Sequence, residues 1–265
     1  VNYTIYVSLY DWVIPDMFFG NASVTVYTVA NQATLQQLLT GLAANTRYYV
    51  SVRTFNPGGW YNTTTSVEII TLPTPIVFAA LESDVVLVRS ATGFTFNWTE
   101  SVDGATNFLN YTIYVYSGAF LINTYVVTDL ATSAQVIASL SPSINYRVFV
   151  RVYNYMWYSD SADYFVWTAP TVVTFPAAPV LVRSATGFTF SWVQHPDPSF
   201  QNYTIYVYDG ATVLNTYVVS NLVTAQQIIT GLSASIQYNV VVRVYNLGGV
   251  FNESSYQVWT QPNPV

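Results

Sequence analysis

Few side chains in this sequence could carry out acid–base or nucleophilic chemistry. The 265 residues include one histidine, His195, and no cysteine. His195 lies in the segment His195-Pro196-Asp197-Pro198, whose two prolines predict a rigid loop between strands. A catalytic triad would need a serine held against this single imidazole, which is the weaker interpretation of such a loop. We therefore expect no catalytic residues and predict that the chain is not an enzyme.

Carboxylates offer a second kind of chemistry. The 13 acidic residues are scattered along the chain and give no obvious acid–base pair. Asp160 and Asp163 lie close enough in sequence to contribute to a Ca²⁺ site, because Ca²⁺ prefers carboxylate and carbonyl oxygens. Two carboxylates are too few unless carbonyl groups and water complete the shell, so a solvated turn is the better interpretation. We predict no metal site and no cofactor.

Asparagine carries a stronger signal. Sequons of the form Asn-x-Ser/Thr accept N-linked glycans in secreted proteins. Three of them belong to one repeated Asn-Tyr-Thr motif on the strand phase expected to face outward, where sugar would cover an apolar surface. Ordinary strand-edge Asn and Thr are the alternative, and O-linked sugar on Thr is another. The candidate glycosylation sites are Asn2, Asn21, Asn62, Asn97, Asn110, Asn202 and Asn252.

The composition excludes several classes of partner. Hydrophobic residues make up 52% and charged residues 8% of the chain, against about 25% charged in an average soluble domain. The formal net charge is −6, and the seven basic residues, all arginines, are dispersed. Nucleic-acid binding requires clustered basic residues, so we predict no nucleic-acid partner.

No apolar run reaches the roughly 18 residues needed to cross a bilayer. The chain begins at Val1, without Met or a signal peptide, so we expect a processed product or part of a longer protein.

The elements that position these residues are internal repeats. The segment 87–98 (LVRSATGFTFNW) recurs at 181–192 with one change, and NYTIYV occurs at 2–7, 110–115 and 202–207. The period of about 92 to 98 residues is that of a whole sandwich domain rather than a solenoid unit. Apolar residues alternate within each segment, which predicts strands. The segment 33–42 could be taken for a helix, but its β-branched counterpart at 225–232 favours a strand there too.

Three features carry a resemblance to a known family. Trp98 and Trp192 occupy the place of a buried second-strand tryptophan. A leucine is followed six residues later by a tyrosine, as in a tyrosine corner, and Asn-x-Gly-Gly follows the sixth strand at 56–59 and 246–249. The chain resembles tandem fibronectin type III domains. The corner pairs are Leu42 with Tyr48, Leu140 with Tyr146, and Leu232 with Tyr238.

The resemblance implies an all-β fold of tandem antiparallel β-sandwiches of the fibronectin type III or immunoglobulin-like class. We expect an incomplete first repeat over 1–73, a second over 74–169 and a third over 170–265. The first repeat begins at its third strand, and about ten extra residues follow that strand. Uncovered core residues Tyr3, Ile5 and Val7 would then require strands from upstream or from another subunit.

Aromatic loops give the last candidates. Large apolar residues exposed at loop tips usually mark an interface, although such loops could also fold back on their own sandwich or stack on sugar rings. With Tyr3, Ile5 and Val7, the assembly-contact candidates are Trp12, Phe18, Phe19, Trp60, Tyr155 and Trp157.

These observations together favour a non-catalytic structural protein. We expect a repeating subunit of a glycosylated extracellular fibre or surface array, assembled head to tail by completion of the open first sandwich. Its partners would be copies of itself and covalent glycans, and its location extracellular or at the cell surface. The alternative is a ligand-binding or spacer segment of an extracellular adhesin or receptor ectodomain.

Overall fold

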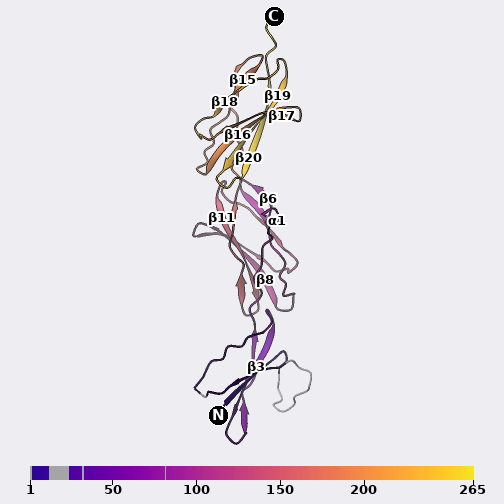
Figure 1. The fold of residues 1–265 in the computed structure, drawn as a ribbon, viewed down its shortest axis with the longest axis vertical. Coiled ribbons are helices and arrows are strands. Elements are labelled where there is room, and N and C mark those ends of the chain that lie inside the picture. Colours follow the sequence, from indigo (N-terminus) through magenta and orange to yellow (C-terminus); the bar gives the residue numbers. More distant parts are fainter. Residues whose placement is uncertain (1, 12–23, 32, 81) are drawn as a thin grey trace.

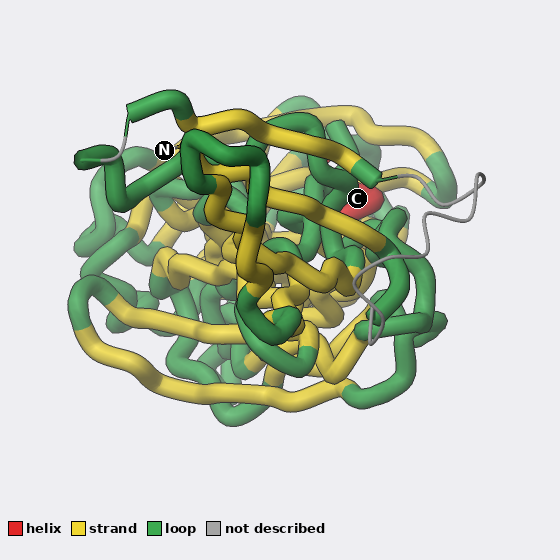
Figure 2. Tube along the Cα trace, turned by 90° about the horizontal axis from the view of Figure 1, so that it is seen from below, coloured by secondary structure: helices red, strands yellow, loops and turns green. Residues whose placement is uncertain are grey.

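The computed structural model describes residues 2–11, 24–31, 33–80 and 82–265. The candidates Trp12, Phe18, Phe19 and Asn21 lie outside these ranges. The described chain forms an elongated row of sheets in sequence order, with the N and C termini at opposite ends (Figure 1). An end-on view shows strands surrounding the long axis (Figure 2).

The second and third repeats each contain two antiparallel sheets. In the second repeat, a three-stranded sheet of order β10-β7-β6 accompanies a sheet of order β12-β11-β8-β9, in which β13 also pairs with β11. The third repeat has the sheets β14-β15-β18 and β17-β16-β19-β20. The prediction of tandem antiparallel sandwiches is confirmed. The elements of the second repeat are α1 (Glu82–Val85), β6 (Val86–Ser90), β7 (Gly93–Asn97), β8 (Phe108–Ser117), β9 (Phe120–Val127), β10 (Ala134–Ile137), β11 (Asn145–Asn154), β12 (Tyr158–Asp160) and β13 (Tyr164–Trp167). Those of the third are β14 (Val180–Arg183), β15 (Gly187–Ser191), β16 (Phe200–Asp209), β17 (Thr212–Val219), β18 (Gln226–Thr230), β19 (Gln237–Asn246) and β20 (Phe251–Trp259).

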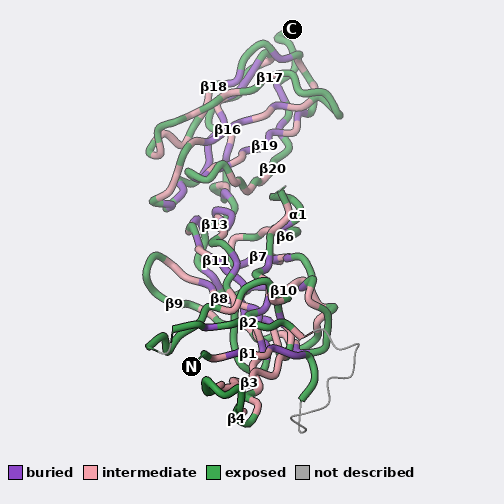
Figure 3. Tube along the Cα trace, turned by 60° about the horizontal axis from the view of Figure 1, so that its bottom comes forward, coloured by how far each residue is buried: buried purple, intermediate pink, exposed green. Residues whose placement is uncertain are grey.

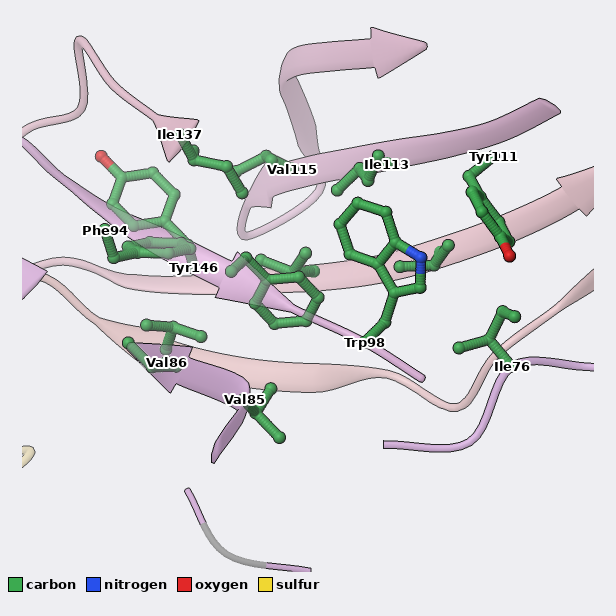
Figure 4. Packing of buried hydrophobic residues seen from close by; sticks show 14 of the residues in the cluster. Ile76, Val85, Val86, Phe94, Trp98, Tyr111, Ile113, Val115, Ile137 and Tyr146 are labelled. Atoms are coloured by element: carbon green, nitrogen blue, oxygen red, sulfur yellow. The ribbon is translucent and has the colours of Figure 1, made fainter. Parts of the chain in front are cut away.

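A closed core lies between the two sheets of each of these repeats. Because successive strand residues point to opposite faces, Ile113 and Val115 of β8 enter the core with Tyr111 and are fully buried. Trp98 approaches from the facing sheet, and its ring meets the Tyr111 ring edge-on with centroids 5.6 Å apart (Figure 4). Trp192 is equally buried in the third repeat. The predicted second-strand tryptophans are therefore confirmed.

All three tyrosine corners are present. The hydroxyl oxygen of Tyr146 accepts a hydrogen bond from the Ser141 backbone N–H at 2.9 Å. The same bond, also 2.9 Å long, joins Tyr48 to Ala43 and Tyr238 to Ser233. The leucine–tyrosine spacing therefore predicted a specific contact in every copy.

Among its described residues, the first repeat has one sheet instead of two. Its described strands form a sheet of order β2-β1-β3-β4, with β5 also paired to β3. Figure 3 shows pink and green predominating around β3 and β4, whereas purple runs through the middle repeat. The strands of the first repeat are β1 (Asn2–Ser8), β2 (Thr25–Val29), β3 (Arg47–Phe55), β4 (Tyr61–Thr63) and β5 (Val67–Ile70).

The prediction of a strand within 33–42 is wrong. Its counterparts, β10 and β18, pair with β7 and β15, the second strands of their repeats. The described part of the first repeat offers no such partner, so the segment crosses the surface without ladder bonds, and Leu35 and Leu38 are exposed. β10 and β18 each pair with a single strand, so the equivalent segment 33–42 cannot form ladder hydrogen bonds where that partner strand is missing from the described residues.

Candidate assembly surfaces

The inner face of the first sheet is only partly covered. Ile5 of β1 is half-buried, although its counterparts Ile113 and Ile205 are 0% exposed. Val52, opposite Ile5 in β3, is also half-buried, whereas Val150 is completely buried. The surface that faces a second sheet in the other repeats is therefore partly open here.

The opening is uneven along β1. Tyr3 and Ile5 are half-buried, but Val7 is 1% exposed and Ser8 beside it is also buried. The expectation that Val7 lies uncovered is therefore wrong, because residues of its own chain already enclose that end of the strand. The candidate contact surface reduces to Tyr3, Ile5 and the neighbouring part of β3.

An arginine–aromatic stack occupies the outer face of every repeat. The Arg151 guanidinium carbon lies 3.8 Å from the centroid of the Tyr158 ring and 5.2 Å from that of Tyr114. Arg53 lies 3.9 Å from Tyr61, and Arg243 lies 4.4 Å from Phe251. These distances fall within the range of cation–π attraction. Each of these arginines is therefore stacked on an aromatic ring of its own sheet.

Hydrogen bonds and burial shift ionisation on this face. Burial and a 3.3 Å hydroxyl–hydroxyl hydrogen bond with Tyr153 raise the pKa of Tyr114 to about 12. Arg151 donates through Nε and Nη2 to the two carboxylate oxygens of Asp160, at 2.6 and 2.9 Å, which raises the pKa of the guanidinium. The outer face is therefore a fixed array of neutral rings and paired charges.

The possible catalytic and metal-binding residues have structural partners. His195 is buried, its Nε2 lies 2.7 Å from the Thr171 hydroxyl, and its backbone N–H donates to the Tyr203 hydroxyl at 2.8 Å. Asp163 accepts from Arg147 at 3.2 Å, while Asp160 pairs with a different arginine. Within the described ranges, no group of three or more potential metal ligands occurs.

The sequon asparagines differ in the hydrogen bonds that their side chains make. The Asn97 and Asn252 amide nitrogens donate to backbone carbonyl groups, of Asp84 at 3.0 Å and of Pro170 at 3.2 Å. In the repeated motif, the side-chain oxygen instead accepts a bond from the sequon threonine, at 2.9 Å in Asn110 and 3.1 Å in Asn202. Among the six sequon asparagines that the structure describes, Asn2 and Asn62 are exposed.

Three of the predicted aromatic contacts fall on described loops. Trp60 is 79% exposed in the β3–β4 turn, and Tyr155 and Trp157 are exposed in the β11–β12 turn. These turns occupy the same place in successive repeats. The β11–β12 turn also contacts the preceding repeat, whose Ile70 N–H meets the Met156 sulfur at 3.2 Å.

Sequence reasoning missed the two asparagines that join the repeats. Asn154 and Asn246 end β11 and β19, and both are buried. Each donates from Nδ2 to a backbone carbonyl of the preceding repeat at 2.9 Å, Asn154 to Thr71 and Asn246 to Thr168. An asparagine recurs at this position in all three copies, but the sequence alone predicts no more than a turn there.

The second and third repeats combine a three-stranded sheet, a larger facing sheet, a buried second-strand tryptophan and a tyrosine corner. Each has the fibronectin type III fold. No protein-family model matches the chain, and no curated protein matches it. Among the described residues, no helix has the length and hydropathy to span a bilayer.

Solved structures of fibronectin type III domains are similar to the chain at low identity. The chicken CNTN1 FN1-FN3 domains share 16% identity over 98% of this chain and 88% of theirs, with a TM-score of 0.36. A two-domain fibronectin type III segment from chicken tenascin shares 15% identity over 71% of this chain and 99% of its own, with a TM-score of 0.39. The fold assignment rests on the sheets and contacts described above, not on these two similarities.

Proposed function

We propose that this chain is a non-catalytic extracellular structural subunit that assembles head to tail, and that an added β-hairpin completes its first repeat. The observation that carries the proposal is the single-layered first sheet. Ile5 and Val52 are only half-buried there, whereas every counterpart in the closed repeats has no exposed surface. Complete burial of such an aliphatic side chain contributes about 1.5–3 kcal/mol relative to full exposure, and covering these half-buried residues would gain the part not yet realised.

The closed repeats indicate what the added hairpin resembles. In the second repeat, β7 presents Phe94 and Phe96 to the core and pairs with β10 on one side and β6 on the other. An equivalent strand in the first repeat would cover Tyr3 and Ile5 and pair with the 35–40 segment. Leu39 would then take the place of Ile137, which is 0% exposed in the second repeat. The occupant is thus a hairpin with alternating aromatic residues.

A hairpin supplied to the whole chain tests this proposal. A peptide with the sequence of residues 86–98 is added in trans, or is fused ahead of Asn2 through a Gly-Ser linker. We expect the amides of β1 and β3 to exchange at least roughly tenfold more slowly. A peptide carrying Phe94→Ser and Phe96→Ser is the matched control. Unchanged exchange with both the peptide and the fusion would refute completion by a hairpin.

The glycan part of the proposal is sharpest at the repeated motif. Asn110 and Asn202 lie on strand faces that point away from the core, as the complete burial of Tyr111 and Tyr203 beside them requires. We expect sugar on these two residues and on exposed Asn2, and none on Asn97, whose amide nitrogen is already bonded. Glycopeptide mass spectrometry of material from the native source, before and after deglycosylation, gives the occupancy of each site.

A spacer segment is the second candidate function. The linear order of the repeats, with the two termini at opposite ends (Figure 1), favours it because a spacer must separate what it connects. Electron microscopy distinguishes the two candidates. Rods that remain single at every concentration favour the spacer, and rods that join at their ends favour the assembling subunit.

A further inference from the structure

Two joints inside the chain define how consecutive repeats dock. At the joint between repeats two and three, Asn246 Oδ1 accepts from the N–H groups of Gly248 at 3.1 Å and Val250 at 3.2 Å, which shapes the β19–β20 turn. The amide nitrogen of the same side chain, Nδ2, donates to the Thr168 carbonyl of the preceding repeat. One side chain therefore both forms the turn and fastens it to its neighbour.

A second hydrogen bond runs beside the first. Asn252 of β20 donates to the Pro170 carbonyl at 3.2 Å, two residues beyond Thr168. At the joint between repeats one and two, Ser159 occupies the same register position and donates to the Pro73 carbonyl at 2.6 Å. Both joints thus bind the linker through carbonyl groups at equivalent positions, Thr71 and Pro73 in one joint and Thr168 and Pro170 in the other.

Two apolar contacts complete the joint. Trp167 packs so closely on Gly248 that an added Cβ would lie 2.3 Å from its ring. Six residues after Trp167, Val173 enters the core of the third repeat. Ile76, at the same position after the first repeat, enters the core of the second.

The β3–β4 turn of the first repeat carries the same docking groups, and no described residue docks on them. Asn56 Oδ1 accepts from the N–H groups of Gly58 and Trp60, both at 3.0 Å, as Asn246 does in its own turn. Asn56 is exposed, and no described residue accepts a bond from its Nδ2. Asn62 is also exposed and pairs with Thr54 at the register position of Asn252.

The last strand presents the other half of the joint. Thr260 repeats the bonds of Thr168, since its hydroxyl accepts from Ile236 N–H at 3.1 Å and donates to the Ser233 carbonyl at 2.7 Å. Its own carbonyl receives no bond from any described residue. Trp259, the counterpart of Trp167, is 53% exposed, and Val265, the counterpart of Val173, is exposed as well.

We infer that the two ends of the chain are complementary and that copies join end to end by reproducing the internal joint. Asn56 donates to the Thr260 carbonyl of the next copy, and Trp259 packs on Gly58. Asn62 donates to the Pro262 carbonyl, and Val265 enters the open side of the first repeat. The occupant is a second copy of this chain, because its own last strand carries the tryptophan, threonine and proline that occupy the joint between repeats two and three.

This inference rests on the proposed function and specifies its contacts. The two ends lie at opposite extremes of the row (Figure 1), so one molecule cannot satisfy its own joint. The joint also places Asn62 against a partner backbone, which leaves no space for a glycan. We therefore expect Asn62 to be unmodified despite its sequon.

Covalent trapping tests the geometry directly, because the native chain has no cysteine. A chain carrying Gly58→Cys and Trp259→Cys should form a ladder of disulfide-linked multimers on a non-reducing gel. The matched internal pair, Trp167→Cys with Gly248→Cys, should close within one chain and give no ladder. A chain carrying only Phe120→Cys, at an exposed site away from both ends, sets the background at one disulfide-linked dimer.

Sedimentation velocity on the cysteine-free chain tests the hydrogen bond. Asn56→Asp keeps an oxygen for the two turn bonds but removes the donor to Thr260. We expect the association constant to fall roughly tenfold or more, with an unchanged unfolding temperature. Asn221→Asp is the control, because Asn221 is an exposed turn asparagine that accepts from Val223 N–H at 3.1 Å and receives the same added charge.

Each outcome decides between the two proposals. A ladder from the end pair together with weakened association of Asn56→Asp supports the joint. Association that is equally strong in the wild type, Asn56→Asp and Gly58→Ala, with no ladder above background, overturns the joint and leaves assembly by another contact. Wild-type chains that remain single up to millimolar concentration, together with no ladder from the chain carrying Gly58→Cys and Trp259→Cys, overturn both.

Discussion

The first and second repeats share strand sequences but differ in what covers them. Ile5 lies opposite Val52 in β3, and Ile113 lies opposite Val150 in β11, so the pairing register is the same in both sheets. Only the second repeat buries these side chains completely. The comparison teaches that register is set within one sheet, by its own alternation and turns, whereas burial is set by the second layer.

Core truncation should show the largest difference between the repeats. Ile113→Ala and Ile205→Ala remove fully buried methyl and methylene groups and should cost about 2–5 kcal/mol each. Ile5→Ala at the equivalent, half-covered position should cost about 1 kcal/mol, because less contact is lost. Hydrogen exchange under increasing urea, followed repeat by repeat, measures the three values separately. Equal costs at Ile5 and Ile113 would show that the first repeat is closed in solution.

Two glycine substitutions probe the three-stranded sheets of the second and third repeats, which have no counterpart in the described part of the first repeat. A Cβ on Gly93 would lie 2.2 Å from the Ile137 carbonyl oxygen, and one on Gly187 would lie 2.2 Å from that of Ile229. Gly93→Ala and Gly187→Ala should therefore separate β7 from β10 and β15 from β18, at a cost of about 1–3 kcal/mol. Exchange at residues 35–40 of the first repeat should not change, and acceleration there would contradict the independence of the repeats.

The outer arginine stacks should differ in salt sensitivity. Asp160→Asn removes a surface ion pair with Arg151 and should cost about 0.2–1 kcal/mol at low ionic strength. The cost should shrink in about 1 M salt, where screening acts over only about 3 Å. In the first repeat the corresponding partner is Thr63, whose hydroxyl accepts from Arg53 Nε at 3.0 Å. Thr63→Val should therefore have an effect that salt leaves unchanged, as denaturant midpoints at both ionic strengths would report.

The smallest effect concerns alkaline pH. Burial raises the pKa of Tyr111 above its ordinary value near 10. Because the folded state favours the neutral phenol, its contribution is complete below about pH 10 and is lost as pH rises through the higher folded pKa. Tyr111→Phe should make the decline of stability above pH 10 shallower, although it loses the bond from Ser101 N–H at 2.8 Å. An equally steep decline in the variant, from unfolding midpoints at pH 8 to 11, would contradict this.

The sequence predicted those features that short-range patterns determine. The alternation in the NYTIYV segments predicted the central strands, and the leucine–tyrosine spacing predicted the three corners. It failed at 33–42, because that strand exists only when a distant second strand pairs with it. It also failed at Val7, whose enclosure depends on how the end of β1 meets the rest of its own repeat.

The contacts across the joints could not be predicted for a related reason, although the asparagine that makes them recurs in every copy. An asparagine after the sixth strand predicts a turn, and the turn is present at Asn56, Asn154 and Asn246. Whether the side-chain nitrogen Nδ2 is bonded depends on a carbonyl group of another repeat. No local sequence pattern shows where that carbonyl group lies. The complementarity that we infer for the two ends rests on the difference between Asn56, whose Nδ2 has no acceptor among the described residues, and the bonded Asn154 and Asn246.

The dual role of these asparagines has a mechanical consequence. At Asn154 and Asn246 the amide that shapes a hairpin also grips the neighbouring repeat. A repeat therefore cannot rotate relative to its neighbour without distorting its own turn. Bending and twisting of the rod are resisted by the geometry of the hairpin and not by the length of the linker. A filament built from such junctions would be stiff along its whole length, and loss of a single side-chain donor would introduce a flexible hinge at one defined place.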